Sequence, residues 1–340
     1  MLLERAGTNY LLVEARHELG GRVRTLRLAD PETYLDVGPA WIWPHQPTVL
    51  GLLRRMDLPV FEQFSRGRLV YEDARGSVAQ HAMATMGGSL RVEGGLVRLV
   101  ESMAGSLDPT RVRTNTRLVG LTRDKDGVVA RFGDQSLLRA RQVVLALPPR
   151  VIAATVEFRP TLAEREVRAL ATVPTWMAGH AKALAVYPEP FWRTEGLNGD
   201  GVSHRGPLGE LHDASPHDAS TGALFGFFGV SAHARRSSRE GLEDRVRAQL
   251  GRLYGPRAAE PLTLKIVDWA DDPLVATGAD LVPPRSHPDY RPLPPLTGDW
   301  SGVVQLASTE VAPAEGGFVE GALTAAEAMA EALAGTRGHA

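Results

Sequence analysis

The sequence predicts an α/β protein in which a sheet of buried parallel strands is interleaved with an α+β domain built on an antiparallel sheet. Residues 10–14 (YLLVE) form a short apolar run that ends in an acidic residue, and the glycine turn 20–22 (GGR) follows, as after a buried parallel strand. Residues 142–147 (QVVLAL) predict a second buried strand that rejoins the same sheet. Residues 319–334, rich in alanine, glutamate and leucine, predict a long C-terminal helix.

Composition narrows the possible partners. The 340 residues carry 38 basic and 40 acidic side chains, a net charge of −2, which offers no broad electrostatic field for nucleic acid or an acidic membrane. A small molecule is therefore the expected partner. The chain has no cysteine, which excludes disulfides, thiolate metal sites and a cysteinyl link to a cofactor.

Histidine spacing and hydropathy exclude further classes. The ten histidines form no HxxxH or HExxH pattern, so no metal site is expected. The pairs at 203–204 (SH) and 212–213 (HD) form no nucleophile motif and are interpreted as polar groups of loops. No apolar run has the length of a membrane helix, and residues 1–16 lack the core of a signal peptide, so a soluble cytoplasmic protein is expected.

The first half of the chain predicts short elements. Residues 48–56 have helical spacing, with Thr48 as the cap. Residues 67–80 alternate apolar and polar side chains and predict a hairpin. The glycine pair at 94–95 precedes a helix, and residues 111–132 predict two or three strands.

The second half predicts the antiparallel sheet. Its strands are expected at residues 178–187, 224–230 and 262–269. Residues 283–295 contain six prolines and predict an irregular connection, because proline lacks the N–H that regular structure uses. A strand at residues 303–307 precedes the C-terminal helix.

These elements divide the chain into two interleaved domains. Residues 1–66, 89–172 and 271–340 are assigned to a discontinuous cofactor-binding domain, and residues 67–88 and 173–270 to a substrate domain.

Spacing at the N-terminus predicts that part of the cofactor domain is missing. A dinucleotide-binding unit has a strand, a glycine loop at a helix N-terminus, and an acidic residue at the end of the next strand roughly 20 residues later. Glu14 stands at such a strand end, and residues 1–7 resemble the last turns of the helix. The gene product is therefore expected to start roughly 25 to 35 residues upstream, so that it includes the first strand and its GxGxxG loop, with that strand between the strands at 11–14 and 303–307.

Several motifs in order resemble those of the flavin monoamine oxidase family, related to phytoene desaturases and protoporphyrinogen oxidase. The motifs are residues 12–16 with 20–25, residues 36–42, the glycines at 94–95, residues 143–149, residues 306–312 and residues 316–322. The resemblance implies a Rossmann-like domain that binds FAD without a covalent link. It assigns to FAD the residues Glu14, Arg16, Gly20, Gly21, Arg22, Gly38, Pro39, Ala40, Trp41, Val128, Glu310, Phe318 and Val319.

In that family the acidic residue binds the adenosine ribose, the glycines and arginine approach the pyrophosphate, and a helix N-terminus faces the pyrimidine edge of the flavin. The unpaired N–H groups of such a terminus favour negative charge. Glu14, the turn 20–22 and the start of the helix at Val319 match these positions. Ser308 departs from the family, which generally has glycine there.

The resemblance also implies catalytic residues. Lys182 matches a lysine linked through water to flavin N5, although a strand-edge lysine with its head in solvent would have the same sequence. Trp269 matches a tryptophan near the flavin, or packs in the core. Phe318 replaces a tyrosine that forms half of an aromatic sandwich, and residues 279–280, where the other half is expected, contain no aromatic side chain.

The function implied is oxidation of an amine by hydride transfer to flavin N5, with oxygen as the acceptor and hydrogen peroxide as a product. One alternative keeps FAD but desaturates carbon–carbon bonds of an apolar substrate, which the incomplete aromatic sandwich favours and Lys182 opposes. Another is a non-catalytic remnant or binding protein, favoured by the missing glycine loop. The expected partners are a small amine or apolar substrate and oxygen.

Overall fold

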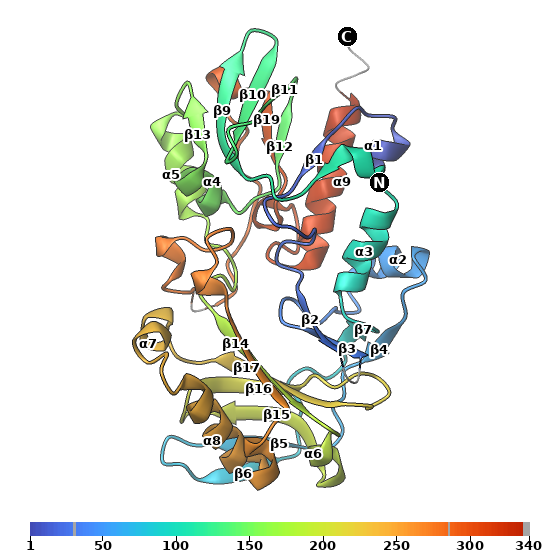
Figure 1. Cartoon of the computed structure of the whole chain (residues 1–340), viewed down its shortest axis with the longest axis vertical. Helices are drawn as coiled ribbons and strands as arrows, with labels where there is room; N and C mark the ends of the chain where they lie inside the picture. Colours follow the sequence, from blue (N-terminus) through green and yellow to red (C-terminus); the bar gives the residue numbers. More distant parts are fainter. Residues whose placement is uncertain (30–31, 285, 336–340) are drawn as a thin grey trace.

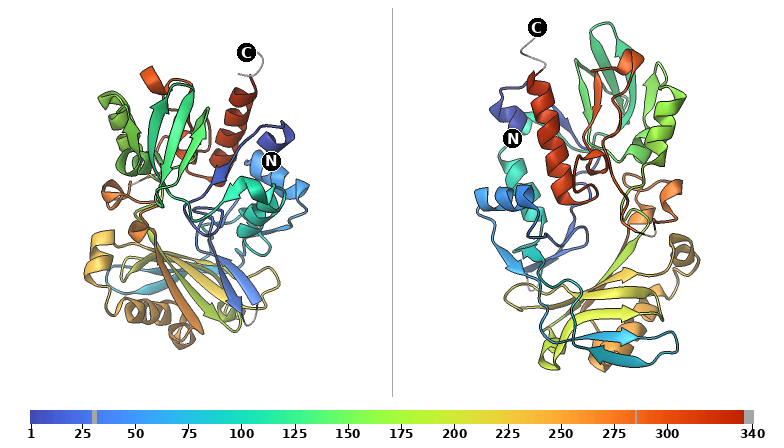
Figure 2. Two further views of the ribbon diagram at one scale, coloured as in Figure 1. Left: turned by 45° about the horizontal axis from the view of Figure 1, so that its top comes forward. Right: turned by 180° about the vertical axis from the view of Figure 1, so that it is seen from behind.

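The computed structural model describes residues 1–29, 32–284 and 286–335. Figure 1 shows a layer of short strands with a long helix, α9 (Val319–Gly335), at one end of the molecule and a large sheet at the other. The N-terminus lies beside α9, so the first and last described segments share one end, and both views in Figure 2 show the same arrangement. Within the described residues, no helix is long and apolar enough to cross a membrane.

Seven strands form the large sheet, in the order β18-β14-β17-β16-β15-β5-β6. Their bounds are Thr263–Asp268 (β18), Ala181–Tyr187 (β14), Gly222–Phe228 (β17), Leu208–Asp213 (β16), Leu197–Ser203 (β15), Arg68–Glu72 (β5) and Val78–His81 (β6). Neighbouring strands are antiparallel except β5 and β15, which run parallel. The predicted antiparallel sheet and hairpin are therefore confirmed, with two additional strands, β15 and β16, that the sequence did not predict.

One face of this sheet is covered by α8 (Leu242–Tyr254). Its apolar side chains recur every three or four residues, which is the spacing of an amphipathic helix. Leu242, Val246 and Leu250 pack with Trp192 in the largest buried core of the molecule.

The other face carries a hairpin of β2 (Thr25–Ala29) and β3 (Glu32–Asp36). Leu35 at the end of this hairpin is fully buried in one cluster with Leu184 and Phe225 of the sheet. The hairpin was assigned to the cofactor domain, but it shares a core with the substrate sheet. The division into domains therefore stays a prediction at this segment.

The cofactor end contains three small sheets. Strand β1 (Leu12–Val13) runs parallel to β8 (Val112–Arg113), and β12 (Val143–Leu145) runs parallel to β19 (Val304–Leu306). The third sheet has the order β11-β10-β9-β13, with bounds Leu137–Ala140, Gly127–Phe132, Leu118–Asp124 and Glu157–Arg159. Within the described residues, β1 and β19 each pair with one strand, so each has an open edge.

The remaining elements connect these sheets. The other helices are α1 (Leu2–Arg5), α2 (Pro47–Arg55), α3 (Val97–Gly105), α4 (Pro149–Thr155), α5 (Glu164–Thr172), α6 (Phe191–Thr194) and α7 (Ala232–Ser237), and β4 (Val60–Glu62) pairs with β7 (Leu90–Val92). The short 3₁₀ helices are η1 (Pro109–Arg111), η2 (Pro256–Ala259), η3 (Trp269–Asp271), η4 (Gly278–Asp280), η5 (Gly298–Trp300) and η6 (Thr309–Val311). The described residues of the proline-rich segment 283–295 contain no helix or strand, as predicted.

The N-terminus of α2 differs from the prediction. The helix begins at Pro47, so Thr48 lies inside it and is not the cap. The carboxylate of Glu320 in α9 accepts the N–H groups of Thr48 at 2.9 Å and Val49 at 2.8 Å. A negative charge from a distant segment thus binds the positive end of α2 and fixes the two helices together.

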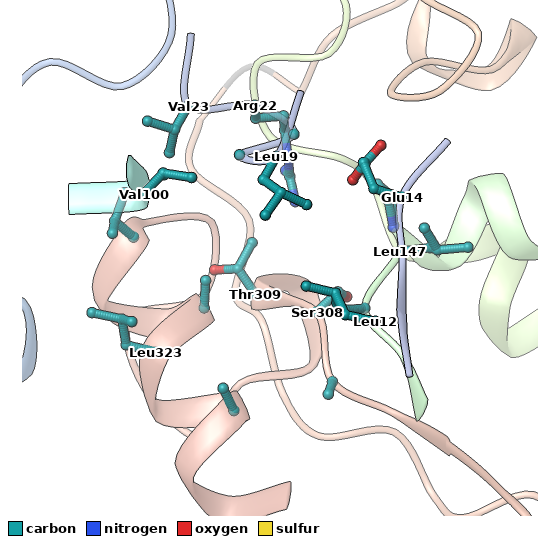
Figure 3. A pocket seen from close by; sticks show the side chains of 18 of the residues that line it. Leu12, Glu14, Leu19, Arg22, Val23, Val100, Leu147, Ser308, Thr309 and Leu323 are labelled. Atoms are coloured by element: carbon teal, nitrogen blue, oxygen red, sulfur yellow. The ribbon is translucent and has the colours of Figure 1, made fainter. Parts of the chain in front are cut away.

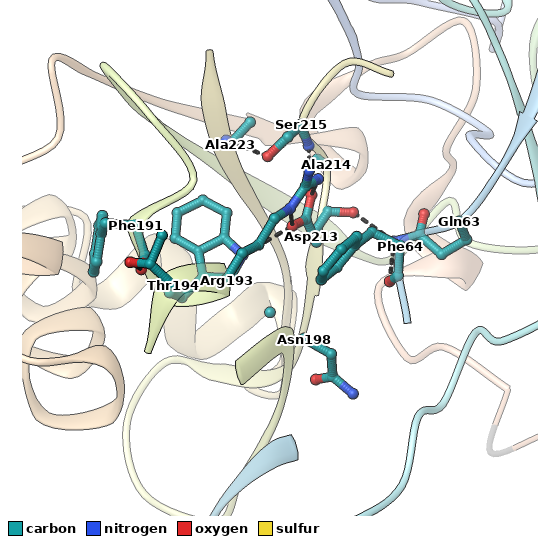
Figure 4. A network of polar contacts seen from close by, with 12 residues as sticks. Gln63, Phe64, Phe191, Arg193, Thr194, Asn198, Asp213, Ala214, Ser215 and Ala223 are labelled. Atoms are coloured by element: carbon teal, nitrogen blue, oxygen red, sulfur yellow. Dashed lines mark hydrogen bonds and ion pairs between the residues drawn. The ribbon is translucent and has the colours of Figure 1, made fainter. Parts of the chain in front are cut away.

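A buried polar network joins β16 to neighbouring segments (Figure 4). Both oxygens of Asp213 bind the guanidinium of Arg193, at 2.7 and 2.9 Å, and one oxygen also accepts the N–H of Trp192 at 2.8 Å. The backbone oxygen of Asp213 accepts the side-chain amide of Gln63. The side chain of Asp213 has no solvent exposure, so each of these groups depends on the others for its partner.

Asp213→Asn is expected to lower the free energy of unfolding by about 3 kcal/mol, because Arg193 would keep its charge without a buried carboxylate. Asp289→Asn, in the exposed pair with Arg291, is the matched control and should change it by less than about 0.5 kcal/mol. Urea unfolding followed by circular dichroism measures both variants. Equal losses in the two variants would contradict this account of the network.

Candidate active site

A cavity of about 2660 Å³ lies where the N-terminal segment, the large sheet and the start of α9 meet. Its lining includes Glu14, Lys182 and Phe318, which are far apart in the sequence. Pockets for one drug-sized ligand have volumes of roughly 300 to 1,000 Å³. The cavity is therefore large enough for a cofactor and a substrate together.

Glu14 stands at the end of β1, where its carboxylate accepts the backbone N–H of Arg16 at 2.7 Å. Figure 3 shows Glu14 and Arg22 from the N-terminal segment around the same pocket as Ser308 and Thr309 from the C-terminal segment. The guanidinium of Arg16 lies 2.6 Å from the carboxylate of Asp272 and is held by it. Glu14 and Arg16 line the cavity, as expected for residues that bind a cofactor.

The predicted glycine turn follows. Gly20 and Gly21 have φ angles of 120° and 59°, which favour glycine because other residues would be strained there. Arg22 binds Glu310 with a distance of 2.5 Å. Burial alone lowers the pKa of Arg22, but the Glu310 carboxylate raises it above its ordinary value. The turn therefore brings a fixed positive charge to the cavity.

All four residues of the next predicted motif, Gly38, Pro39, Ala40 and Trp41, also line the cavity. A Cβ atom at Gly38 would lie 2.2 Å from the backbone oxygen of Arg22, so only glycine allows the two loops to approach this closely. The indole N–H of Trp41 donates to Gln63 at 2.9 Å, which fixes the ring.

Lys182 in β14 is 7% exposed and lines the cavity, so its head does not lie in bulk solvent. Its ammonium donates to the backbone oxygen of Gly38 at 2.6 Å and lies 5.3 Å from the ring centroids of Phe225 and Phe227. Burial lowers the pKa of Lys182 to about 7, and the charge of Asp36 opposes that shift only partly. A group that changes charge near neutral pH therefore lies at the meeting point of the loops and the sheet.

Asp36 itself is buried beside α3. Its carboxylate accepts the hydroxyl of Thr25 at 2.7 Å and the N–H of Leu96 at 3.0 Å. Burial raises the pKa of Asp36 to about 6, although these hydrogen bonds favour the ionised form. The Asp36 carboxylate thus connects the start of β2 to the residue before α3.

Trp269 is 4% exposed, and it both packs in a core cluster and lines the cavity. Its indole N–H donates to the backbone oxygen of Val37 at 3.3 Å. The guanidinium of Arg24 lies 5.6 Å from its ring centroid. Both interpretations of this residue are therefore compatible with its position.

The aromatic surroundings of Phe318 differ from the expectation. Asp280, where an aromatic partner was sought, is buried and bound to Arg150 at 2.6 Å. Instead His287, from the proline-rich segment, stacks on Phe318 with a centroid distance of 4.9 Å and an angle of 10°. Trp176 contacts the same histidine at 4.9 Å. The proline-rich segment thus supplies an aromatic neighbour that its sequence did not predict.

The start of α9 completes this side of the cavity. Thr309 accepts the N–H of Gly317 at 2.9 Å and donates to the backbone oxygen of Phe318 at 2.7 Å, which fixes the first turn. Val319 follows at the helix N-terminus and lines the cavity. The hydroxyl of Ser308 also lines it and is buried without a hydrogen-bond partner among the described residues.

Two predicted cofactor residues do not line the cavity. Val128 is fully buried between β9 and β11 in the core of the four-stranded sheet. Glu310 is also fully buried and acts through Arg22, while its second oxygen has no partner among the described residues. No group of three or more metal-ligating side chains occurs in the described ranges.

Two polar residues of the cavity, Glu210 and His212, were not predicted from the sequence. His212 and Asp213 belong to β16 rather than to a loop, and both are buried, which corrects the interpretation of the 212–213 pair. Ser203 likewise ends β15. The alternation of side chains in residues 208–213 was the only available signal, and glycine and charge interrupt it.

Lys182→Met is expected to remove a pH dependence of stability. The pKa of Lys182 is about 7 in the folded chain against an ordinary value of 10.5, so the unfolded chain binds more protons between these values. The free energy of unfolding of the wild type should therefore increase by roughly 3 kcal/mol from pH 7 to 10 relative to the variant. Lys265→Met, in the exposed position on β18, should keep that increase. Unfolding curves across this pH range test the expectation, and parallel curves for wild type and Lys182→Met would contradict it.

Comparison with known proteins identifies the family. Residues 2–85 and 78–334 match the sequence profile of the flavin containing amine oxidoreductases. The chain is 31% identical over 250 residues to a protein of Mycobacterium tuberculosis named as a flavin-containing monoamine oxidase, covering 72% of this chain and 52% of that one. It is 26% identical over 275 residues to amine oxidase [flavin-containing] B of Sus scrofa, covering 78% and 51%. The chain thus spans about half the length of these curated relatives.

Solved structures share the fold. Cyclohexylamine oxidase from Brevibacterium oxydans superimposes with a TM-score of 0.83 at 18% identity, covering 99% of this chain and 96% of that one. Putrescine oxidase bound to putrescine gives a TM-score of 0.79 at 19% identity, covering 98% and 95%. With the sequence match over nearly its whole length, the chain belongs to the family of flavin-containing amine oxidoreductases, enzymes that use FAD.

Proposed function

We propose that this chain forms the flavin site and substrate pocket of an amine oxidase. The reaction is oxidation of the carbon–nitrogen bond of a small amine, with oxygen as the electron acceptor and hydrogen peroxide as a product. The observation that carries the proposal is the position of Lys182. Its side chain is buried, donates a hydrogen bond to Gly38 and lines the cavity between the cofactor loops and the sheet.

The residues around the cavity fit FAD. The carboxylate of Glu14 can accept the ribose hydroxyls, and the turn 20–22 offers backbone N–H groups and the charge of Arg22 to the pyrophosphate. The N–H groups at the start of α9 lack partners within the helix and can stabilise negative charge on the flavin ring. Bound there, FAD would supply the two-electron oxidation chemistry.

Lys182 has two roles in this proposal. Its protonated form stabilises the negative charge that develops on oxygen as oxygen is reduced, and the buried surroundings strengthen that effect. Its hydrogen bond to Gly38 also fixes the loop 38–41 against β14.

The same surroundings favour the reactive form of the substrate. An amine must lose its proton before its carbon–nitrogen bond is oxidised, and a poorly solvated cavity disfavours the charged form. Lys182 is subject to the same effect, since its burial lowers its pKa. The rings of Phe318 and Trp176 line the cavity and can orient the amine, while the exposed ring of His287 stacks on Phe318.

The open edges of β1 and β19 bear on cofactor affinity. Strand β1 lines the cavity, β19 leads into the lining residues Ala307 and Ser308, and each strand can accept one more parallel strand. A strand with a glycine loop in that position would add a phosphate site next to the turn 20–22.

The first prediction of this proposal concerns the spectrum. The purified protein is mixed with FAD and separated from free cofactor. A flavin absorption band that amines bleach without oxygen, and that returns with hydrogen peroxide when oxygen is admitted, is the expected result. If the protein binds FAD and no amine of a broad panel bleaches it, amine oxidation is excluded.

The second concerns Lys182. In Lys182→Met, the rate at which oxygen reoxidises the reduced protein should fall by about 10²-fold, because a preorganised charge of this kind contributes roughly that factor. Reduction by the amine should change less, since Lys182 acts on the oxygen step. Stopped-flow spectroscopy separates the two rates, with Lys265→Met as control. Unchanged reoxidation would remove Lys182 from the proposed role.

A further inference from the structure

A row of three side chains crosses the floor of the cavity. Lys182 in β14 pairs with Phe227 in β17, and Phe227 pairs with Glu210 in β16. Directly opposite residues in an antiparallel sheet point to the same face, and all three line the cavity. Two strand spacings separate the Cα atoms of Lys182 and Glu210 by about 10 Å.

Glu210 belongs to a charged trio that holds it in place. Its Oε1 lies 3.0 Å from Nε2 of His212, whose Nδ1 lies 3.0 Å from Oδ1 of Asp200. Burial alone lowers the pKa of His212, but Asp200 and Glu210 together raise it above its ordinary value, which favours the imidazolium form. The trio contains two acidic side chains against one imidazole, so acidic charge is in excess there.

That charge is accessible to a ligand only at Glu210. The side chains of Asp200 and His212 are 2% and 1% exposed, whereas that of Glu210 is 47% exposed. Asp200 is also occupied by the N–H of Thr85 at 2.7 Å. Oε2 of Glu210 has no partner among the residues that the structure describes, so it can accept a hydrogen bond from a ligand.

The surface between Lys182 and Glu210 is apolar. Phe227 lies between them in the row, and the ring of Trp41 lies 6.2 Å from that of Phe227 and 4.9 Å from that of His212. Such walls suit a chain of methylene groups but cannot pair with a charge in the middle of it. The polar groups of this floor are thus confined to its two ends.

We infer that Glu210 binds a second positively charged nitrogen, at the end of the substrate opposite the carbon that is oxidised near Lys182. The preferred substrates are then linear diamines, with their methylene chain along Phe227 and Trp41. A simple monoamine of the same length would offer no hydrogen bond to Oε2 of Glu210, and an amine that carries a distal carboxylate would be repelled. This inference rests on the proposed amine oxidation and specifies its substrate class.

Glu210→Gln tests the inference in the FAD-loaded protein. With a series of linear diamines and monoamines of matched length, the ratio of kcat/KM for diamine over monoamine should fall at least about tenfold, mainly through KM. Glu62→Gln, an exposed glutamate on β4 outside the cavity, is the control and should leave the ratio as in wild type. An unchanged ratio in Glu210→Gln overturns the inference while amine oxidation itself stands.

A charge reversal gives a second test. Glu210→Lys should lose preference for diamines and gain relative activity toward amines with a distal carboxylate, because the new ammonium attracts that group. Should Glu210→Lys keep the wild-type order of preference, Glu210 does not face the distal end of the substrate.

Calorimetric titration with a diamine separates this inference from the proposed function. If no amine reduces the flavin but diamine binding weakens at least about tenfold in Glu210→Gln, the oxidation proposal fails and the cation site at Glu210 stands. If diamines neither reduce the flavin nor bind in a way that depends on Glu210, both fail.

Discussion

A buried ion pair between Arg22 and Glu310 joins two segments that lie 288 positions apart in the sequence. Glu310 has no solvent exposure, and a buried carboxylate without its cation costs several kcal/mol, so the two segments are held together. The backbone of Arg22 then lies against Gly38, and the oxygen of Gly38 accepts the ammonium of Lys182. This chain of contacts connects the segment before α9, the glycine turn and the large sheet. The charge pair therefore helps to place these three segments around the cavity.

Much of the fold was predictable because its strands have continuous local patterns. The strands β14, β17 and β18 lie within the residues predicted for them or begin two positions earlier, and α9 begins at the predicted residue. The strand β15 was not predicted, since Asn198, Gly199 and Asp200 disfavour strands, and it forms because β5 and β16 supply partners on both sides. The hydrogen bond from the N-terminus of α2 to Glu320 in α9 could not be predicted either, because no local pattern connects positions 272 residues apart.

The same difference between local sequence patterns and contacts between distant positions applies to the candidate site. Glu14, the turn 20–22, the loop 38–41 and Lys182 could be identified because they belong to compact motifs, and the structure brings them to one cavity. Their roles toward FAD and substrate stay predictions. His287 beside Phe318 could not be identified, because the path of the proline-rich segment is set by tertiary contacts such as the hydrogen bond from Tyr290 to Pro174.

The parallel pairing of β5 with β15 has a consequence for synthesis on the ribosome. The side chains of Glu72 and Ser203 at the ends of these strands bond across 131 positions, which take on the order of ten seconds to translate. During that interval β5 presents Leu69 and Val70, both buried in the finished protein, to the solvent or to chaperones. The hairpin of β5 and β6 can join the sheet only after β15 has emerged. The rate at which the residues between β5 and β15 are translated thus determines how long the apolar edge at β5 can aggregate.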